Sequence, residues 1–308
     1  MWSPFKAYTA NCDAEEREAG MEISTKEVAL FIVYPDKESN KYSRGVVGLL
    51  TGSERFPGAG VVSSKGALRR GAGLCRYIGE NQFCNSLVLN SCPEIVIGEG
   101  KCDSFLVGSG ISDIFHDSRS DLARRLLTNP SMYREERGWL VLDAGAMDLI
   151  LDFTSLVPTV ITPHSGDLQR LLKKKGVEVE VQTILKDPVH FANLASTLFS
   201  CAVLLKGSCT VVADGNFVEE VNADCHFLAC AGTGDVLAGF LAGFLALTKP
   251  KSERELVRTC AVAAYLHNLS AKIASKSFEG PGHPIIASDV ADNLPNAYLW
   301  AARKDKLE

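Results

Sequence analysis

The stretch from Cys230 to Gly239, which reads CAGTGDVLAG, places a glycine-rich turn and a carboxylate at the predicted start of an apolar helix. Gly232 and Gly234 can adopt positive φ, so the N–H groups of Gly232, Thr233 and Gly234 could form an anion hole at the positive end of that helix. Asp235 lies at the same point and could take a proton from a hydroxyl that attacks a phosphate. A helix start that Asp235 merely caps explains the same pattern, and these residues alone leave both interpretations open.

Two further segments could bind a ligand. His164, in Thr162–Asp167, follows an apolar run and could donate a hydrogen bond near neutral pH. The alternative is a structural histidine in a helix start that Thr162 or Ser165 caps. In the second segment, the side chain of Lys206 and the backbone amides of Gly207, Ser208, Cys209 and Thr210 could hold a nucleotide, with the Thr210 hydroxyl as a further contact. A plain hairpin turn with a solvated lysine is the alternative, and the GxxxxGK[ST] pattern of a P-loop is absent.

Small residues mark a third group of positions. In Phe56–Gly60, Ala59 lies at a predicted helix entry where a flat ligand could lie against the backbone, although close helix–strand packing explains it equally well. Gly108 and Gly110 follow a predicted middle strand. Asp143 follows the next strand and could be a ligand or a capping residue, and we do not count it among the catalytic residues.

The pattern of apolar runs predicts the elements that position these segments. From Gly45 onward, strand-like and helix-like stretches alternate, which favours a doubly wound, mostly parallel sheet flanked by helices in a single domain. In such a sheet, ligands bind beyond the carboxyl ends of the strands, where most of the segments above fall. We expect residues 1–40 to be a lead-in segment and residues 41–308 to be the domain. The expected strands are 45–53, 86–89, 94–97, 104–107, 139–142, 159–161, 202–205 and 210–212, followed by a hairpin over 211–221. The expected helices are 58–74, 118–127, 164–175, 188–199, one from 234, 252–275 and 288–303.

Composition narrows the class of protein. The 308 residues are 46% hydrophobic, and 32 Lys and Arg stand against 37 Asp and Glu, a net charge of −5. With no basic stripe, nucleic acid is excluded as an expected partner. The ten cysteines form no CxxC pair and no secretory leader or membrane-spanning run is recognisable, so we expect reduced thiols in a cytoplasmic protein without a membrane partner.

Five ordered motifs together resemble the NAD(P)H-hydrate dehydratase family of the ribokinase-like superfamily. They are PGAGVVSSKGALRRGAGL at 57–74, LDAGAMDLI at 142–150, TPHSGDLQRLL at 162–172, LLKGSCTVV at 204–212 and AGTGDVLAG at 231–239. The resemblance runs from about Gly45 to about Leu299 and implies a ribokinase-like fold. Two positions depart from the common family pattern: Asp167 stands where Glu is usual, and the loop at 108–112 reads GSGIS where GPGLG is common.

The resemblance also implies an activity, the repair of hydrated nicotinamide dinucleotides by a hydro-lyase. ADP or ATP, with Mg²⁺, would phosphorylate the ring hydroxyl of (S)-NADHX or (S)-NADPHX, and loss of phosphate would restore NADH or NADPH. It places Asp235 as the catalytic base, which also contacts the substrate together with Ala59, His164 and either Gly108 or Gly110. Lys206 to Thr210 and Gly234 would bind the nucleotide. The metal ligands, the choice between ADP and ATP, and the choice between NADHX and NADPHX are not determined.

Two other functions use the same residues. A ribokinase-like kinase of a small molecule, a vitamin precursor or a sugar, would stop at the phosphorylated product, and a non-catalytic nucleotide sensor would lack turnover, against which the presence of Asp235 argues. Relatives of this kind often form homotetramers, and many are fused to an epimerase that interconverts the hydrate isomers. Because the resemblance begins at about Gly45, we expect that epimerase to be a separate protein here.

Overall fold

The computed structural model describes residues 21–22, 25–135, 137–223, 225–278 and 280–304. Its centre is a sheet with the strand order β1-β10-β9-β8-β7-β6-β5-β2-β3-β4. Neighbouring strands are parallel except at β8/β9 and β9/β10, which are antiparallel. The doubly wound, mostly parallel sheet predicted from the sequence is therefore confirmed. The strands are β1 Met21–Glu22, β2 Val46–Leu50, β3 Leu74–Tyr77, β4 Val96–Ile97, β5 Ser104–Val107, β6 Trp139–Leu142, β7 Thr159–Ile161, β8 Ala202–Leu205, β9 Cys209–Ala213 and β10 Val218–Asn222.

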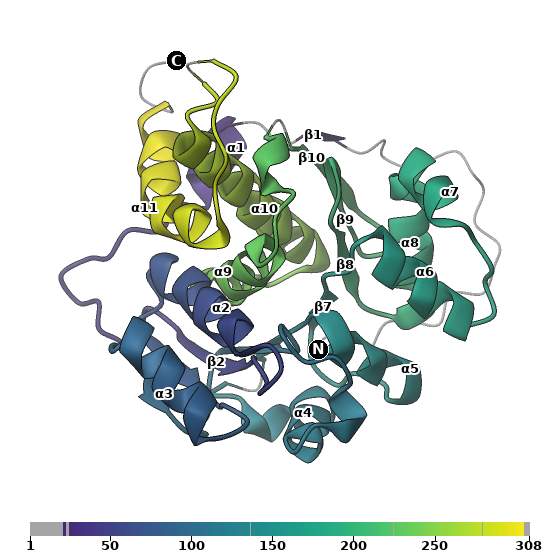
Figure 1. Ribbon diagram of the computed structural model, residues 1–308, viewed down its shortest axis with the longest axis horizontal. Helices are drawn as coiled ribbons and strands as arrows, with labels where there is room; N and C mark the ends of the chain where they lie inside the picture. Colours follow the sequence, from purple (N-terminus) through teal and green to yellow (C-terminus); the bar gives the residue numbers. More distant parts are fainter. Residues whose placement is uncertain (1–20, 23–24, 136, 224, 279, 305–308) are drawn as a thin grey trace.

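Helices cover both faces of the sheet (Figure 1). Side chains of the central strands alternate between two buried apolar clusters, one on each face, because successive residues of a strand point to opposite sides. One cluster packs under α2 Pro57–Arg69, α3 Gln82–Ser91, α9 Thr233–Thr248, α10 Glu253–Ser275 and α11 Ala287–Lys304. The other packs under α4 Ser120–Thr128, α5 Leu149–Asp152, α6 Ser165–Lys174, α7 Val181–Lys186 and α8 Pro188–Phe199.

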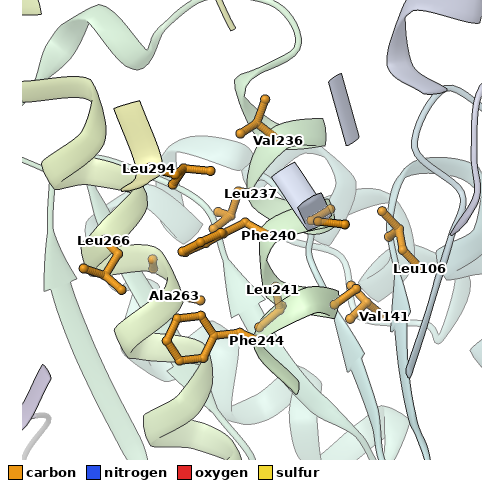
Figure 2. Close-up of a cluster of buried hydrophobic side chains, with 14 of the residues drawn as sticks. Leu106, Val141, Val236, Leu237, Phe240, Leu241, Phe244, Ala263, Leu266 and Leu294 are labelled. Atoms are coloured by element: carbon orange, nitrogen blue, oxygen red, sulfur yellow. The ribbon is translucent and has the colours of Figure 1, made fainter. Parts of the chain in front are cut away.

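Helix α9 is buried along almost its whole length. Phe240 and Phe244 pack edge to face with ring centroids 5.5 Å apart, and Leu106 and Val141 of the sheet lie across from the helix (Figure 2). Helix α2 also packs on α9, so closely that a Cβ added at Gly239 would lie 2.0 Å from the carbonyl oxygen of Ser63. The first turn of α9 packs on the middle of α2 in the same way, because a Cβ added at Gly66 would lie 2.3 Å from the carbonyl oxygen of Val236.

Two of the predicted elements were wrong. The apolar run 86–89, expected to be a strand, lies inside α3, whose first turn is capped by the Asn81 side chain accepting a hydrogen bond from the amide of Cys84 at 3.0 Å. A run of four apolar residues cannot distinguish a strand from a buried helix turn, and the cap decided it. The helix expected over 58–74 ends at Arg69, because Gly71 turns the chain at φ +86° and the next residues form β3.

The described part of the predicted lead-in segment packs on the rest of the molecule. Strand β1 pairs in parallel with β10, and in α1 Thr25–Leu30 the side chain of Val28 is buried in the cluster under α9 to α11. Residues 1–20, which are the first half of the predicted lead-in segment and include Cys12, lie outside the described residues. The domain boundary at residue 40 stays a proposal.

The nine cysteines within the described residues form no disulfide with one another, as expected for reduced thiols. Among those same residues, no helix combines the length and the apolar character needed to cross a membrane.

Candidate active site

The turn before α9 has the geometry of an anion site. Gly232 is at the N-cap with φ +91°, and no side chain caps the helix. The hydroxyl of Thr233 instead donates to the carbonyl oxygens of Leu228 and Cys230, both at 2.9 Å, which fixes the turn from behind. The uncapped first-turn amides of a helix favour an anion at this point. Gly232 thus has the predicted positive φ, whereas the same prediction for Gly234 was wrong, because Gly234 already lies in the first turn of α9.

A buried histidine that no sequence pattern indicated supports this turn. His267 of α10 lies 3.0 Å, through Nε2, from the carbonyl oxygen of Thr233. Because a carbonyl can only accept, Nε2 must carry the proton. Burial lowers the pKa of His267 to about 4, so the ring is neutral at physiological pH and supports the turn only as a hydrogen-bond donor. No local motif surrounds His267 in the sequence, and only the packing of α10 on α9 reveals its function.

Asp235 lies in the first turn of α9 and is partly buried. Burial, and next the charge of Asp143, raise the pKa of Asp235 to about 6, against the charge of Lys206 and the influence of the nearby Ser109 hydroxyl. A carboxylate with a pKa close to physiological pH is suited to take and return a proton, because both of its forms are then accessible.

Asp143, which follows β6, is a further residue of this site, although the sequence did not place it among the catalytic residues. Its side chain accepts hydrogen bonds from the Ser109 hydroxyl at 2.8 Å, the Thr162 hydroxyl at 2.8 Å and Nζ of Lys206 at 3.0 Å. Burial acts to raise its pKa, but the charge of Lys206 and these hydrogen bonds outweigh it and hold the pKa below its ordinary value. Asp143 is therefore ionised, in contrast to the raised pKa of Asp235 beside it. Its place after a middle strand was the available signal in the sequence.

Lys206, at the end of β8, connects the two carboxylates to the start of α9. It forms an ion pair with Asp143, and a Cβ added at Gly234 would lie 3.4 Å from Nζ. Two residues predicted to bind the nucleotide, Lys206 and Gly234, therefore lie together. The connection that follows is the tight turn between antiparallel strands that was expected. In it Gly207 and Ser208 are exposed, Cys209 is partly exposed and Thr210 is only 4% exposed, so the first two are the most open to a ligand.

The glycines after β5 have different surroundings. A Cβ at Gly108 would lie 1.9 Å from the carbonyl oxygen of Asp143, so this residue is a glycine because the next strand end packs against it. A Cβ at Gly110 would lie 2.5 Å from the Cβ of Ala59 and 3.1 Å from the Cα of Gly52. Gly110 and Ala59 thus form one small-residue surface, near the Ser109 hydroxyl.

His164 is the N-cap of α6, so the expectation that Thr162 or Ser165 caps this helix was wrong. Nδ1 of His164 accepts from the amides of Gly166 and Asp167 at 3.0 and 3.1 Å, and Asp167 accepts from the His164 amide at 3.2 Å. The Thr162 hydroxyl turns to Asp143 instead. The His164 side chain is still 63% exposed, and its backbone pairs with that of Lys206, so it borders the same edge of the sheet.

The fold is ribokinase-like, and the candidate site lies at the carboxyl edge of its sheet. A crystal structure of a ribokinase-like superfamily protein from Enterococcus faecalis superposes with a TM-score of 0.76 at 21% identity, covering 95% of this chain and all of that one. The structure of an ADP/ATP-dependent NAD(P)H-hydrate dehydratase from Bacillus subtilis, co-crystallised with ATP/Mg²⁺, gives 0.77 at 23% identity over 92% of this chain and all of that one.

Sequence comparison identifies the family. The family model described as NAD(P)H-hydrate dehydratase matches residues 47–284. A bifunctional NAD(P)H-hydrate repair enzyme of Corynebacterium glutamicum is 32% identical over 85% of this chain and 48% of its own length. An ADP-dependent (S)-NAD(P)H-hydrate dehydratase of Enterococcus faecalis is 28% identical over 84% of this chain and 86% of its own length. The chain belongs to the NAD(P)H-hydrate dehydratase family, and it spans about half the length of the bifunctional relatives it matches.

Proposed function

We propose that this protein is a lyase that dehydrates (S)-NADHX and (S)-NADPHX to NADH and NADPH, using ADP or ATP, and so repairs damaged nicotinamide nucleotides. The observation that carries the proposal is Asp235, a carboxylate whose pKa is raised to about 6 beside the uncapped start of α9. Membership of the dehydratase family supports the substrate.

The reaction would begin with Asp235 accepting the proton of the ring hydroxyl while the hydroxyl oxygen attacks the terminal phosphorus of the nucleotide. The bond from that phosphorus to the bridging oxygen breaks, and the shortened nucleotide leaves. The carbon–oxygen bond to the phosphate then breaks and the adjacent ring carbon loses a proton to water, which restores the ring double bond. The amides of Gly232, Thr233 and Gly234 would stabilise the charge on the transferred phosphoryl group, which is the main task of a protein in such a transfer.

The remaining residues would hold the two ligands. On the nucleotide side we propose Lys206 with Gly207 to Thr210 and Gly234, since Lys206 already lies at the start of α9. On the dinucleotide side we propose Ala59 with Gly110 and His164. Gly110 is favoured over Gly108 because it faces Ala59, whereas Gly108 is covered by the backbone of Asp143.

Magnesium fits this site only as a companion of the nucleotide. Within the described residues no group of three or more His, Cys, Asp or Glu side chains could hold a metal ion by itself. Mg²⁺ at phosphates usually takes one or two carboxylates and fills its other positions with phosphate oxygens and water. Asp143 and Asp235 are the carboxylates that could serve. When bound, the ion would neutralise phosphate charge, and a relative's crystals grown with ATP/Mg²⁺ are consistent with that proposal.

The kinase alternative is distinguished by its product. Purified protein is incubated with hydrated NADH and either ADP or ATP while the absorbance of reduced nicotinamide is followed. Recovery of that absorbance supports a dehydratase, and a stable phosphoester without recovery would indicate a kinase. Parallel reactions with hydrated NADPH and with each nucleotide determine the preferred substrate and donor.

The assembly and the pathway context are proposals of the same kind. We propose a cytoplasmic homotetramer, by resemblance, acting with an epimerase that interconverts the hydrate isomers. Relatives named bifunctional repair enzymes support a link between dehydration and a second activity. Light scattering of the purified protein measures the oligomeric state directly.

A further inference from the structure

A buried guanidinium lies directly beneath the turn that follows β2. Arg119, at the start of α4, is 7% exposed. Its side chain donates to the carbonyl oxygens of Thr51 at 3.2 Å, Ile78 at 3.0 Å and Gly52 at 2.7 Å. One side chain thus links the carboxyl ends of β2 and β3 to α4, at the edge of the sheet that carries the site.

Asp117 completes the arrangement and neutralises the charge. Its two carboxylate oxygens accept from Nε and Nη2 of Arg119 at 2.8 and 2.7 Å, and its side chain is 3% exposed. The five N–H groups of the guanidinium are therefore all used. Only arginine presents five donors in a rigid plane, so a lysine could not reproduce this set of bonds.

The turn held by Arg119 is in contact with the candidate site. Gly52 has φ +67° and its amide donates to the carbonyl oxygen of Ser109 at 2.7 Å. The hydroxyl of Ser53 donates to the carbonyl oxygen of Gly110 at 2.7 Å. Two hydrogen bonds thus connect the turn after β2 to the two residues that border Asp143 and Ala59.

The same turn borders an open cavity of about 420 Å³, lined among others by Ser53, Ile111 and Asp117. That volume is within the range of small-molecule sites. Its lining residue Ile111 follows Gly110 directly in the chain, so the cavity adjoins Gly110. A ligand that lies on Gly110 and Ala59 could therefore extend into it.

We propose that Arg119 is a positioning residue for the hydrated dinucleotide. It holds the Gly52–Ser53 turn in place, and through that turn it also holds Gly110 and the wall of the cavity. This arrangement is required for binding of the dinucleotide but not of the phosphoryl donor. This inference rests on the proposed function. It assigns Arg119 no contact with either ligand, so its effect must appear as a difference between the two.

The test is Arg119→Lys, which keeps the positive charge but lacks the planar fork. We expect the KM for hydrated NADH to rise about tenfold or more, since small displacements of positioned groups have effects of this size, while the KM for the nucleotide stays within about twofold. The dissociation constant for hydrated NADH without nucleotide, measured by calorimetry, should rise by the same factor. Arg124→Lys is the matched control, because Arg124 lies on the same helix but is exposed and pairs with Asp121. It should change neither constant.

The possible outcomes separate the two claims. If wild-type protein recovers no reduced nicotinamide from hydrated NADH with ADP or ATP, the proposed function is wrong and this inference falls with it. If the wild type is active but Arg119→Lys raises both KM values equally, or only lowers the melting temperature, Arg119 merely supports the fold. Should Arg119→Lys fail to fold, Asp117→Asn keeps the shape of the pair and weakens it. A KM for hydrated NADH unchanged in Asp117→Asn would then overturn the inference.

Discussion

Replacing Asp235 by asparagine should abolish turnover and at the same time stabilise the protein. Asparagine keeps the shape of the side chain but cannot accept a proton. General base catalysis contributes about 10²- to 10⁴-fold, so kcat should fall by at least about a hundredfold while nucleotide binding is retained. In the wild type, the base must be ionised, and the pKa of Asp235 is about 6. The rate of the wild type should therefore fall about tenfold per pH unit below pH 6.

The gain in stability follows from the same raised pKa. The folded-state pKa of Asp235 is raised from 3.8 to about 6, so between these values the folded protein binds more protons than the unfolded chain. Stability is therefore lost as the pH rises through that window. At about 1.4 kcal/mol per pKa unit, the ionised carboxylate destabilises the fold by up to about 3 kcal/mol above pH 6. Asparagine carries no charge to bury, so the variant should be more stable than the wild type at pH 8, and the difference should disappear below pH 4.

Urea unfolding at pH 8 and at pH 4, together with the recovery of reduced nicotinamide from its hydrate, measures both effects. Asp121→Asn is the matched control, because Asp121 also lies in the first turn of a helix but is exposed and pairs with Arg124. That variant should keep its activity. A rate for Asp235→Asn above about one tenth of the wild-type rate would refute the general base, and a variant less stable than the wild type at pH 8 would refute the burial argument.

Four further variants test residues around the site and one residue that acts on the fold. Lys206→Ala should raise the KM for the nucleotide more than the KM for the dinucleotide. An equal change in both would mean that Lys206 only forms the ion pair with Asp143. His164→Ala should raise the KM for the dinucleotide and, by loss of the helix cap, lower stability by about 1 kcal/mol, whereas His164→Asn should raise the KM but keep the cap. Normal kinetics in His164→Asn would mean that His164 only caps α6. Asp103→Ala leaves Arg134 and Lys249 without the buried carboxylate that they share. The free energy of unfolding, measured with urea, should therefore fall by about 3 kcal/mol, while neither KM changes. A change in KM would contradict the view that Asp103 acts only on the fold.

The short segments that turn sharply were predictable from the sequence. Gly232 before an apolar run predicted the turn at the start of α9, and Lys206 before a tight turn predicted its place at the carboxyl edge. These predictions succeed because a positive φ and helical spacing are local requirements that only a few residue types meet. The prediction of a strand over 86–89 failed for the opposite reason, since its four residues fit a strand and a helix equally.

Contacts between distant segments were decided only by the tertiary structure. Asp143 and Lys206 are far apart in the sequence, and their ion pair exists because parallel strands bring their carboxyl ends to one edge. The raised pKa of Asp235 depends on that meeting and on burial under the surrounding elements, as does the support of Thr233 by His267. The sequence by itself determined which residues could do the chemistry, because residue type and local conformation are written along the chain. Which of them share a charge, a proton or a ligand was decided by packing, because electrostatic and hydrogen-bonding energies depend on distances that only the folded chain defines.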